Sequence, residues 1–411
     1  MLSFLVVVFY LFFTYFVLVV LYLFGLSVSG LLFRRTKVRG GVVPEPDLTN
    51  EDAKLTKKIA ILVPAYKEDG VILSSMMHHL ELDYPKELYD VYLLADSFQE
   101  STLEELKSFP VTVLVMSFEK STKIKSLNDA LRRIQKNYDI AVISDADNVL
   151  ARDFLKKIHA GFLAGDRVIQ GRRVAKNMDT SFAVLDACSE AINNHIFRKG
   201  ANALGLSSPL IGSGTAFDFL MLRELLKGID SSVEDKVLQL KIVQQGIFIR
   251  YMEDALVFDE KVGSHQAFGH QRKRWVSGQF VNLKESFLPA CRELFRGNMS
   301  FFNLGVVNNL ILPRAFLFVL LPAMVLAGFF LSPHWGIAAA IVLAVYLFSL
   351  TIAIPRALLN RDLFSALLTL PKAIVVMAGA LFQMKKSHKV FIHTVHTKTE
   401  ISNSLFNDNG K

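Results

Sequence analysis

The first 33 residues contain no charged side chain, and the whole chain of 411 residues contains only two cysteines. Two cysteines exclude a disulfide framework and a thiolate metal site. The uncharged run is longer than the roughly 20 residues that cross a bilayer. A cleaved signal peptide, the competing interpretation, would require positive charge before a shorter apolar run of about 7–15 residues. The pattern therefore favours a transmembrane helix over 1–33, and the basic residues that follow it predict a cytoplasmic domain.

Residues 55–262, which follow a juxtamembrane linker over 34–54, show the pattern of a soluble α/β domain. Short apolar runs separated by helix-like stretches predict strands at 59–64, 91–95, 111–116 and 140–144. Strands that alternate with helices favour a parallel sheet covered on both faces. Ligands of such sheets bind beyond the carboxyl ends of the strands, so polar residues just after each run are the candidates for chemistry.

The chain changes character after residue 262, where an interfacial segment and a membrane region are expected. Basic and aromatic residues without a spanning apolar run predict a segment that lies along the bilayer surface. Three apolar stretches farther on predict a C-terminal membrane region, and a polar tail follows it. The expected segments are 263–300 at the interface, 301–384 in the membrane, with apolar stretches at 303–331, 335–355 and 363–383, and the tail 385–411.

The third apolar stretch is expected to be re-entrant or interfacial. Pro371 and Lys372 lie near its centre, and an unpaired lysine is costly in the bilayer core. The tail is then expected in the cytoplasm, within reach of the active site. Much of the net charge of +8 lies beside membrane segments, at 34–39 and 385–389. Charge in those places fits anionic lipid, so a lipid bilayer is expected as a partner and nucleic acid is not.

Two carboxylates, Asp145 and Asp147, directly follow the predicted strand at 140–144. Carboxylates two residues apart on a turn can face one hard cation, and Mg²⁺ or Mn²⁺ there would also hold a diphosphate. Transfer from a nucleotide sugar needs such a cation, because the departing diphosphate develops negative charge. The alternative is an acidic turn that caps the next helix.

The ends of the first two predicted strands, and the helix over 122–136, carry further candidates for donor binding. An aromatic ring and a carboxylate at adjacent strand ends can hold a base and its ribose, and lysines at a helix start can meet phosphate. The candidates are Pro64, Tyr66, Glu68, Asp96, Lys123 and Lys125. Each of these patterns also occurs in ordinary turns and solvated helix starts.

Two later motifs are candidates for the acceptor side and for the chemical step. Gly212, Ser213 and Gly214 would let the backbone approach a ligand closely, although a plain turn explains them equally well. One carboxylate of Glu234 and Asp235, at a predicted helix start, can act as the general base that deprotonates an acceptor hydroxyl. Helix electrostatics alone also favours acidic residues in a first turn.

A third motif lies in the interfacial segment. Gln271, Arg274 and Trp275 have the spacing i, i+3, i+4, so they share one face of a helix. A cation beside an indole can contact a diphosphate and stack on a sugar. A basic interfacial helix with tryptophan as its membrane anchor is the alternative.

In this order and spacing, the motifs over roughly 57–300 resemble the family-2 glycosyltransferases of the processive membrane type, which include cellulose, chitin, hyaluronan and poly-N-acetylglucosamine synthases. The matching motifs are VPAYKE, Asp96, KIKSLNDAL, the D-x-D, Gly212-Ser213-Gly214, Glu234-Asp235 and the Q-x-x-R-W over 271–275. The resemblance implies a GT-A nucleotide-diphosphosugar transferase domain with a mostly parallel sheet and transmembrane helices at both ends. It also implies inverting, metal-dependent transfer from a nucleotide sugar, expected to be a UDP-sugar, at the cytoplasmic membrane face.

The resemblance further implies roles for individual residues. Asp235 would be the catalytic base, Asp147 the main metal ligand with Asp145 beside it, and Mg²⁺ or Mn²⁺ the cofactor. The expected donor-binding residues are Pro64, Tyr66, Glu68, Asp96, Lys125, Asp145, Gln271 and Arg274. The expected acceptor-binding residues are Gly212, Ser213, Gly214, Glu234 and Trp275.

Three functions remain open from the sequence. The resemblance favours transfer to a growing polysaccharide at a bacterial inner membrane, with export or accessory subunits as further partners. A single addition to a lipid acceptor is the first alternative, and product length would separate the two. A nucleotide-sugar-binding subunit of an export complex is the second, although a binding module needs no general base.

Overall fold

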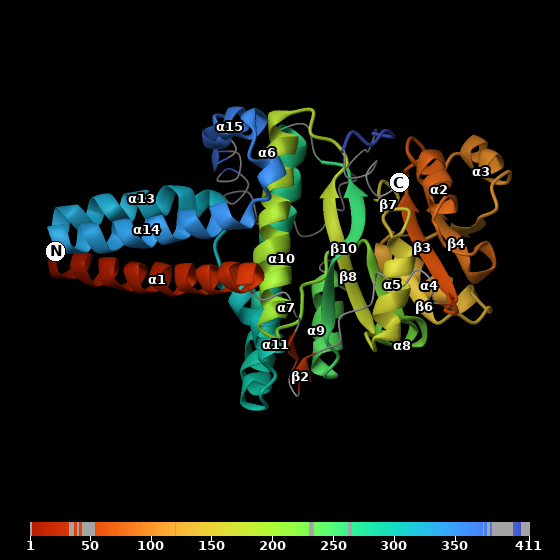
Figure 1. The fold of residues 1–411 in the computed structure, drawn as a ribbon, viewed down its shortest axis with the longest axis horizontal. Helices are drawn as coiled ribbons and strands as arrows, with labels where there is room; N and C mark the ends of the chain where they lie inside the picture. Colours follow the sequence, from red (N-terminus) through yellow and green to blue (C-terminus); the bar gives the residue numbers. More distant parts are fainter. Residues whose placement is uncertain are drawn as a thin grey trace.

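The computed structural model describes residues 2–32, 37–38, 41–42, 54–119, 121–229, 234–261, 265–372, 374–375, 379 and 398–403. Figure 1 shows an α/β domain on one side and three long apolar helices on the other, with a layer of transverse helices between them. A two-stranded ribbon of β1 (Lys37–Val38) and β2 (Gly41–Val42) follows the first helix.

The described strands of the α/β domain form one eight-stranded mixed sheet. Across the sheet they are β5 (Thr112–Met116), β4 (Tyr89–Asp96), β3 (Ile59–Tyr66), β6 (Ile140–Ile143), β9 (Thr215–Asp218), β8 (Val168–Ala175), β10 (Ile249–Asp259) and β7 (Val149–Leu150). The four predicted strands are β3 to β6, and they pair in parallel. β9 is antiparallel to both of its neighbours, so the sheet is mixed and mostly parallel, as the predicted fold class requires.

Helices cover both faces of the sheet because the strands are apolar on both sides. Ile59, Ile61 and Val63 of β3 face one apolar core, whereas Ala60 and Leu62 face the other, as the alternation of a strand requires. The first core includes α2 (Ile72–Leu80), α3 (Glu100–Leu106) and α5 (Phe154–Leu163). The second includes α4 (Lys123–Arg133), α8 (Phe219–Leu225) and α9 (Glu234–Gln244).

Three helices are long and apolar enough to cross a bilayer, judged by length and composition in the part of the chain that the structure describes. They are α1 (Leu2–Leu32), α13 (Arg314–Leu331) and α14 (Pro333–Ala353). They lie side by side in Figure 1, and the rings of Tyr10 and Trp335 are 4.9 Å apart. The predicted helix over 1–33 is therefore present as α1.

The predicted stretch over 303–331 is not one helix. The elements α11 (Met299–Phe302), the π-helix η3 (Asn303–Val307) and α12 (Asn308–Leu310) precede a break, after which α13 begins at Arg314. Pro313 explains the break, because a proline disfavours helical backbone in the residue before it. Within the predicted stretch 363–383, the helix α15 (Arg361–Leu367) is short, and most positions beyond Lys372 lie outside the described residues.

A layer of transverse helices joins the two parts of the molecule. α10 (His265–Phe295) runs crosswise to the three apolar helices, and so does α6 (Ser181–Asn193), which continues through the π-helix η2 (Asn194–Gly200) into α7 (Ala201–Ala203) (Figure 1). Four large apolar side chains of α10 are exposed, namely Phe280, Phe287, Leu288 and Phe295. Their spacing places them on one face, which fits a helix at a bilayer surface.

The first apolar helix contacts this layer backbone to backbone. A Cβ atom added to Gly200 would lie 2.1 Å from the carbonyl oxygen of Leu26, so only glycine permits the approach. The ring nitrogen Nε2 of His195 lies 2.9 Å from the carbonyl oxygen of Ser27 and therefore donates to it. The carboxyl end of α1 is thus fixed on η2.

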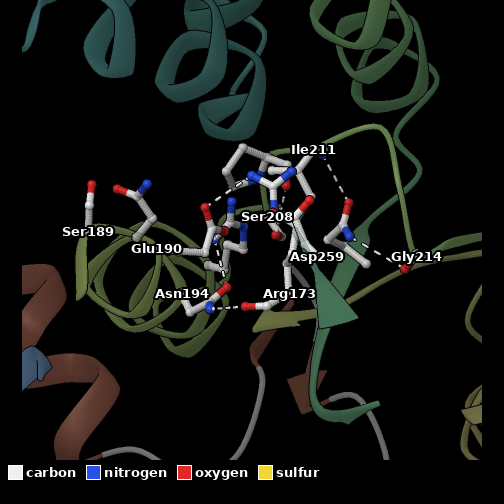
Figure 2. Close-up of polar contacts among 12 residues, drawn as sticks. Arg173, Ser189, Glu190, Asn194, Ser208, Ile211, Gly214 and Asp259 are labelled. Carbon is white, nitrogen blue, oxygen red and sulfur yellow. Dashed lines mark hydrogen bonds and ion pairs between the residues drawn. The ribbon is translucent and has the colours of Figure 1, made fainter. Parts of the chain in front are cut away.

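A buried cluster of charged side chains fixes the same layer to the sheet. Glu190 of α6 lies between two guanidinium groups, at 3.0 Å from Arg173 and 2.9 Å from Arg198. Figure 2 shows Arg173 and Glu190 converging with Asp259, which lies 3.5 Å from Arg173 Nε. Burial alone would raise the pKa of Glu190, but the two arginines outweigh it and hold that pKa well below its usual range.

Removal of the Glu190 charge should be strongly destabilising. In Glu190→Gln, Arg198 loses its ion pair with Glu190 and Arg173 keeps only Asp259. Breaking one side of a buried ion pair costs about 3–5 kcal/mol. Glu253→Gln is the control, because Glu253 pairs with Lys199 at a partly exposed site where such pairs contribute about 0–1 kcal/mol. Denaturant unfolding in detergent measures both variants. Equal losses of unfolding free energy would contradict the role of the cluster.

Candidate active site

The adjacent carboxyl ends of β3 and β4 carry an aromatic ring and a carboxylate, which suit the binding of a nucleoside. Tyr66 and Asp96 are register partners, and the Lys67 N–H donates to the carbonyl oxygen of Asp96 at 3.1 Å. Both Lys67 and Ser97 have left-handed backbone, with φ of 57° and 58°. Such conformations cost free energy and gather at functional sites.

Asp96 has an oxygen ready to accept a hydrogen bond. The residue is 3% exposed, its Oδ1 accepts from the Ser97 hydroxyl at 3.0 Å, and its buried Oδ2 has no hydrogen-bond partner among the described residues. A buried acceptor without a donor is costly, so a ribose or base donor fits this position. Pro64 lies two residues before Tyr66 on β3. The backbone carbonyl oxygen of Glu68 accepts from the N–H groups at the start of α2.

The D-x-D lies on the turn after β6 and is held by two other segments. The Asp145 N–H donates to the Ser213 hydroxyl at 2.9 Å, and the Asn148 amide donates to the same oxygen at 2.6 Å. Lys123 of α4 pairs with the Asp145 carboxylate and also donates to the carbonyl oxygen of Gly212 at 2.7 Å. The loop over 212–214 and the D-x-D therefore form one connected unit.

The second carboxylate of the D-x-D also has a nearby cation. Asp147 is 6% exposed, and its carbonyl oxygen accepts from Lys176 Nζ at 3.1 Å. Burial lowers the pKa of Lys176, and the charge of Asp147 opposes that effect. Carboxylate oxygens are the ligands that Mg²⁺ and Mn²⁺ prefer, and a nucleotide-bound cation usually takes one or two of them together with phosphate oxygens. The two aspartates fit that requirement.

A buried histidine contacts the residue that precedes this turn. His79 of α2 is 1% exposed, with Nδ1 2.6 Å from the Ser75 carbonyl and Nε2 3.1 Å from the Ser144 hydroxyl. Because a carbonyl oxygen only accepts, Nδ1 carries the proton and Nε2 accepts from Ser144. Burial lowers the pKa of His79 to about 4.

The His79 imidazole should make stability depend on acid. Its pKa is about 4 when folded and 6.5 ordinarily, so the unfolded chain binds more protons between these values. The stabilisation is complete above pH 6.5 and is lost as the pH falls toward 4, by about 2 kcal/mol between pH 6.5 and 5. Denaturant unfolding should show a shallower pH slope for His79→Gln than for the wild type. Equal slopes for wild type and His79→Gln would contradict this.

Asp235 lies against the glycine loop. A Cβ atom added to Gly212, where φ is +80°, would lie 2.6 Å from Asp235 Oδ2. Helix α9, which carries Asp235, also holds the loop directly, because Gln239 accepts from the Leu210 N–H at 3.1 Å. The predicted base and the D-x-D thus both contact this loop, Asp235 at Gly212 and Asp145 at Ser213.

The remaining predicted residues lie on the helices next to this loop. Glu234 begins α9 beside Asp235, and Gln271, Arg274 and Trp275 lie on α10. The Trp275 side chain is half-buried, whereas those of Glu234, Gln271 and Arg274 lie outside the described part of the structure. Their placement on adjoining helices agrees with the prediction, and their roles remain predictions.

Several residues of the site were not assigned these contacts from the sequence. The Ser213 hydroxyl holds the D-x-D turn, and Lys123 pairs with Asp145. The Lys125 N–H donates to the Thr122 hydroxyl, which caps α4. Gln170 accepts from the Ile211 N–H at 3.1 Å and donates to the Ser213 carbonyl at 3.0 Å. The lysine pair was a visible signal, but nothing in the pattern marks Gln170.

The described part of the C-terminal tail, residues 398–403, lies on the domain beside Asp147. The Ser402 N–H donates to the carbonyl oxygen of Lys176 at 3.0 Å, and the Lys398 N–H donates to Glu260 at 3.0 Å. On the other side, the Ser74 hydroxyl donates to the Thr399 carbonyl at 3.4 Å. These contacts place residues 398–403 on the α/β domain, and the tail's reach to the active site remains a prediction.

Comparison with known proteins finds glycosyltransferases among the proteins similar to this chain. The chain is 23% identical over 253 residues to a probable glycosyltransferase, YdaM, of Bacillus subtilis, covering 57% of this chain and 58% of that protein. It is 23% identical over 262 residues to a beta-monoglucosyldiacylglycerol synthase of Synechocystis, covering 60% and 53%. The chain therefore spans little more than half the length of these relatives.

A solved structure shares the fold over almost the whole chain. A mannosyltransferase of Pyrobaculum calidifontis, solved with GDP-mannose and Mn²⁺, superposes with a TM-score of 0.54 at 17% identity, covering 95% of this chain and all of that one. The fold is thus GT-A-like, as predicted. Residues 57–278 match the family described as glycosyltransferase-like family 2. With more than half of its residues in that match, the chain belongs to glycosyltransferase family 2.

Proposed function

We propose that this chain transfers one sugar from a nucleotide donor to a lipid acceptor at the cytoplasmic face of the membrane. The observation that carries the proposal is the contact of Asp235 with Gly212, on the loop whose next residue, Ser213, holds the D-x-D. A base and a diphosphate site that are held by one loop can act on the same sugar carbon, which a displacement requires. Helix α9 also packs on the layer next to the apolar helices.

The donor would lie across the carboxyl edge of the sheet. Tyr66 and Asp96, with Pro64 and Glu68 beside them, would hold the nucleoside, because Asp96 Oδ2 is a buried acceptor with no donor in the described part of the chain. Asp147 and Asp145 would hold Mg²⁺ or Mn²⁺, which neutralises the departing diphosphate when it is bound. The structural neighbour solved with GDP-mannose and Mn²⁺ supports a divalent cation.

The chemical step would be an inverting displacement. The Asp235 carboxylate would take the proton of the acceptor hydroxyl, whose oxygen forms a bond to the anomeric carbon. The bond from that carbon to the diphosphate oxygen breaks, and the diphosphate leaves with the electron pair. Trp275, from the neighbouring helix α10, would lie beneath the acceptor, with Gln271 and Arg274 toward the diphosphate. A correctly aligned base contributes about 10²–10⁴-fold to such a step.

A lipid acceptor is favoured over a growing polysaccharide, which the sequence pattern alone favoured. Relatives named beta-monoglucosyldiacylglycerol synthase support a lipid. The exposed apolar face of α10 supports the same choice, because it would place the site at the bilayer surface. Product length separates the two acceptors.

The test uses the purified chain in lipid nanodiscs. UDP- and GDP-sugars are offered with and without diacylglycerol, and released nucleotide and product mass are measured. We expect nucleotide release that depends on the lipid, and a product one sugar heavier than the acceptor. A ladder of masses would overturn single addition in favour of a polymerising enzyme. No release with any donor and acceptor would overturn the proposed function.

The cytoplasmic location is tested by labelling. Ser402 is exposed and lies on the catalytic domain, so Ser402→Cys reports the side on which that domain lies. After Cys188 and Cys291 are replaced by serine, an impermeant thiol reagent should label Ser402→Cys only in opened cells. Efficient labelling of intact cells would place the domain outside.

A further inference from the structure

A chain of hydrogen bonds through the adjacent residues Asn308 and Asn309 links the first apolar helix to the helix that carries Asp235. The Tyr22 hydroxyl of α1 lies 2.8 Å from Asn308 Oδ1. Gln279 of α10 donates to the carbonyl oxygen of Asn309 at 3.0 Å, and the Asn309 side chain accepts from Lys236 Nζ at 3.2 Å. The chain therefore connects three layers of the molecule.

Asn309 is a fixed acceptor at the centre of this chain. It is 5% exposed, and its amide nitrogen donates to the carbonyl oxygens of Leu304 at 2.9 Å and Gly305 at 3.0 Å. Those carbonyls belong to the π-helix η3, a type of irregularity found often at functional sites. With both amide protons used, the side chain presents only its oxygen to Lys236.

Lys236 follows Asp235 in the first turn of α9 and lies half-buried. Neighbouring residues of a helix point about 100° apart. Here Asp235 contacts the glycine loop, whereas Lys236 contacts the membrane-side layer. A rotation of α9 that moves one side chain must therefore move the other. Burial lowers the pKa of Lys236, and the charge of Asp235 opposes that effect.

We propose that Lys236 is a positioning residue. Its hydrogen bond to Asn309 orients the first turn of α9 so that the Asp235 carboxylate lies against Gly212. The seating of the base thus depends on the layer that contacts the apolar helices. This inference rests on the proposed role of Asp235. An apolar side chain would fill the same space at lower desolvation cost, so packing alone does not account for a lysine here.

Steady-state kinetics in nanodiscs test the positioning role. Lys236→Met should lower kcat by about 10- to 100-fold, since a small misplacement of a reacting group has effects of that size, with KM for the donor nearly unchanged. Lys236→Arg, which can still donate to Asn309, should recover most of the rate. Lys241→Met removes a lysine of the same helix that donates to the carbonyls of Leu225 and Lys227, and should leave kcat unchanged.

A double-variant cycle tests whether Lys236 acts through Asn309. If it does, Lys236→Met combined with Asn309→Leu should lose no more rate than the larger single loss, because the two changes break one interaction. Losses that multiply would overturn the coupling. A rise in KM at constant kcat would overturn the positioning role, because it would mean that Lys236 contributes to binding instead.

Hydrogen exchange provides a readout that does not depend on transfer. In Lys236→Met, backbone exchange should rise in the first turns of α9 and in the loop over 210–214, and not in α5. A local change of this kind reports opening of one unit rather than unfolding of the domain. Unchanged exchange would overturn the inference even if Asp235 is the base. If exchange rises in Lys236→Met but the wild type shows no transfer activity, only the proposed function would be overturned.

Discussion

Asp235→Asn should abolish sugar transfer while leaving donor binding nearly intact. The asparagine amide has nearly the same shape as the carboxylate and retains its seat against Gly212, but it cannot take a proton. We expect a loss in kcat of about 10²–10⁴-fold. Donor affinity should change little, because a base acts in the transition state rather than in the ground state. Initial rates and calorimetry with the nucleotide measure the two quantities.

Asp254→Asn serves as the matched control for Asp235→Asn. Asp254 is exposed on β10, and its carbonyl oxygen accepts from Lys157. The same chemical change at that position should leave the rate within about twofold of wild type, as expected for a surface substitution. A folded Asp235→Asn that cannot bind donor would identify Asp235 as a donor ligand and contradict its role as base.

Asp147→Asn should cause the second large loss. Without this carboxylate the cation is held more weakly, so the charge of the departing diphosphate is not compensated. Removal of such electrostatic stabilisation typically costs about 10²–10³-fold in kcat. Initial rates measured against Mg²⁺ and Mn²⁺ concentration should show a lower maximum and a requirement for more metal. A variant that keeps more than about a tenth of the wild-type rate would contradict this role.

Lys123→Met distinguishes the role of Asp145 from that of Asp147, because Lys123 pairs with Asp145. Lys123 neutralises Asp145 and binds the Gly212 carbonyl, so its removal should disturb the loop as well as the turn. Asp147 is next to Lys176 instead. If both aspartates served only a structural turn, Asp147→Asn would affect thermal stability and not the metal requirement.

Much of the fold follows from local patterns in the chain. The strands β3 to β6 are short apolar runs between polar turns, and α1 and α14 are long uncharged runs, so neighbouring residues determine them. The antiparallel pairing of β9 could not be predicted in this way, because it depends on segments about 75 residues apart along the chain. The break before α13 required the effect of Pro313 to be weighed against a strongly apolar stretch.

The candidate site divides along the same line. Tyr66 and Asp96 end β3 and β4, and Asp145 and Asp147 follow β6. All four could be proposed from the sequence because the ends of parallel strands meet at one edge. The hydrogen bond from the Asp145 N–H to the Ser213 hydroxyl joins residues 68 positions apart. Contacts of that range depend on how the strands are ordered in the sheet, and no local pattern reports that order.

Lys236 illustrates the limit most clearly. In the chain it is an ordinary lysine after an acidic pair, where a solvated side chain is the usual expectation. Its contact with Asn309 exists only because α9 packs on the helices that follow α10. The residue becomes a candidate only when the layers of the molecule are assembled.

The most direct test of the central claim is a stoichiometry. The purified chain in vesicles that contain diacylglycerol receives a nucleotide sugar labelled in the sugar, and nucleoside diphosphate and labelled lipid are counted in the same sample. The account predicts one nucleoside diphosphate released for each sugar on lipid, with both amounts lost together in Asp235→Asn. Nucleotide release without labelled lipid, or labelled lipid that persists at the wild-type rate in Asp235→Asn, would contradict it.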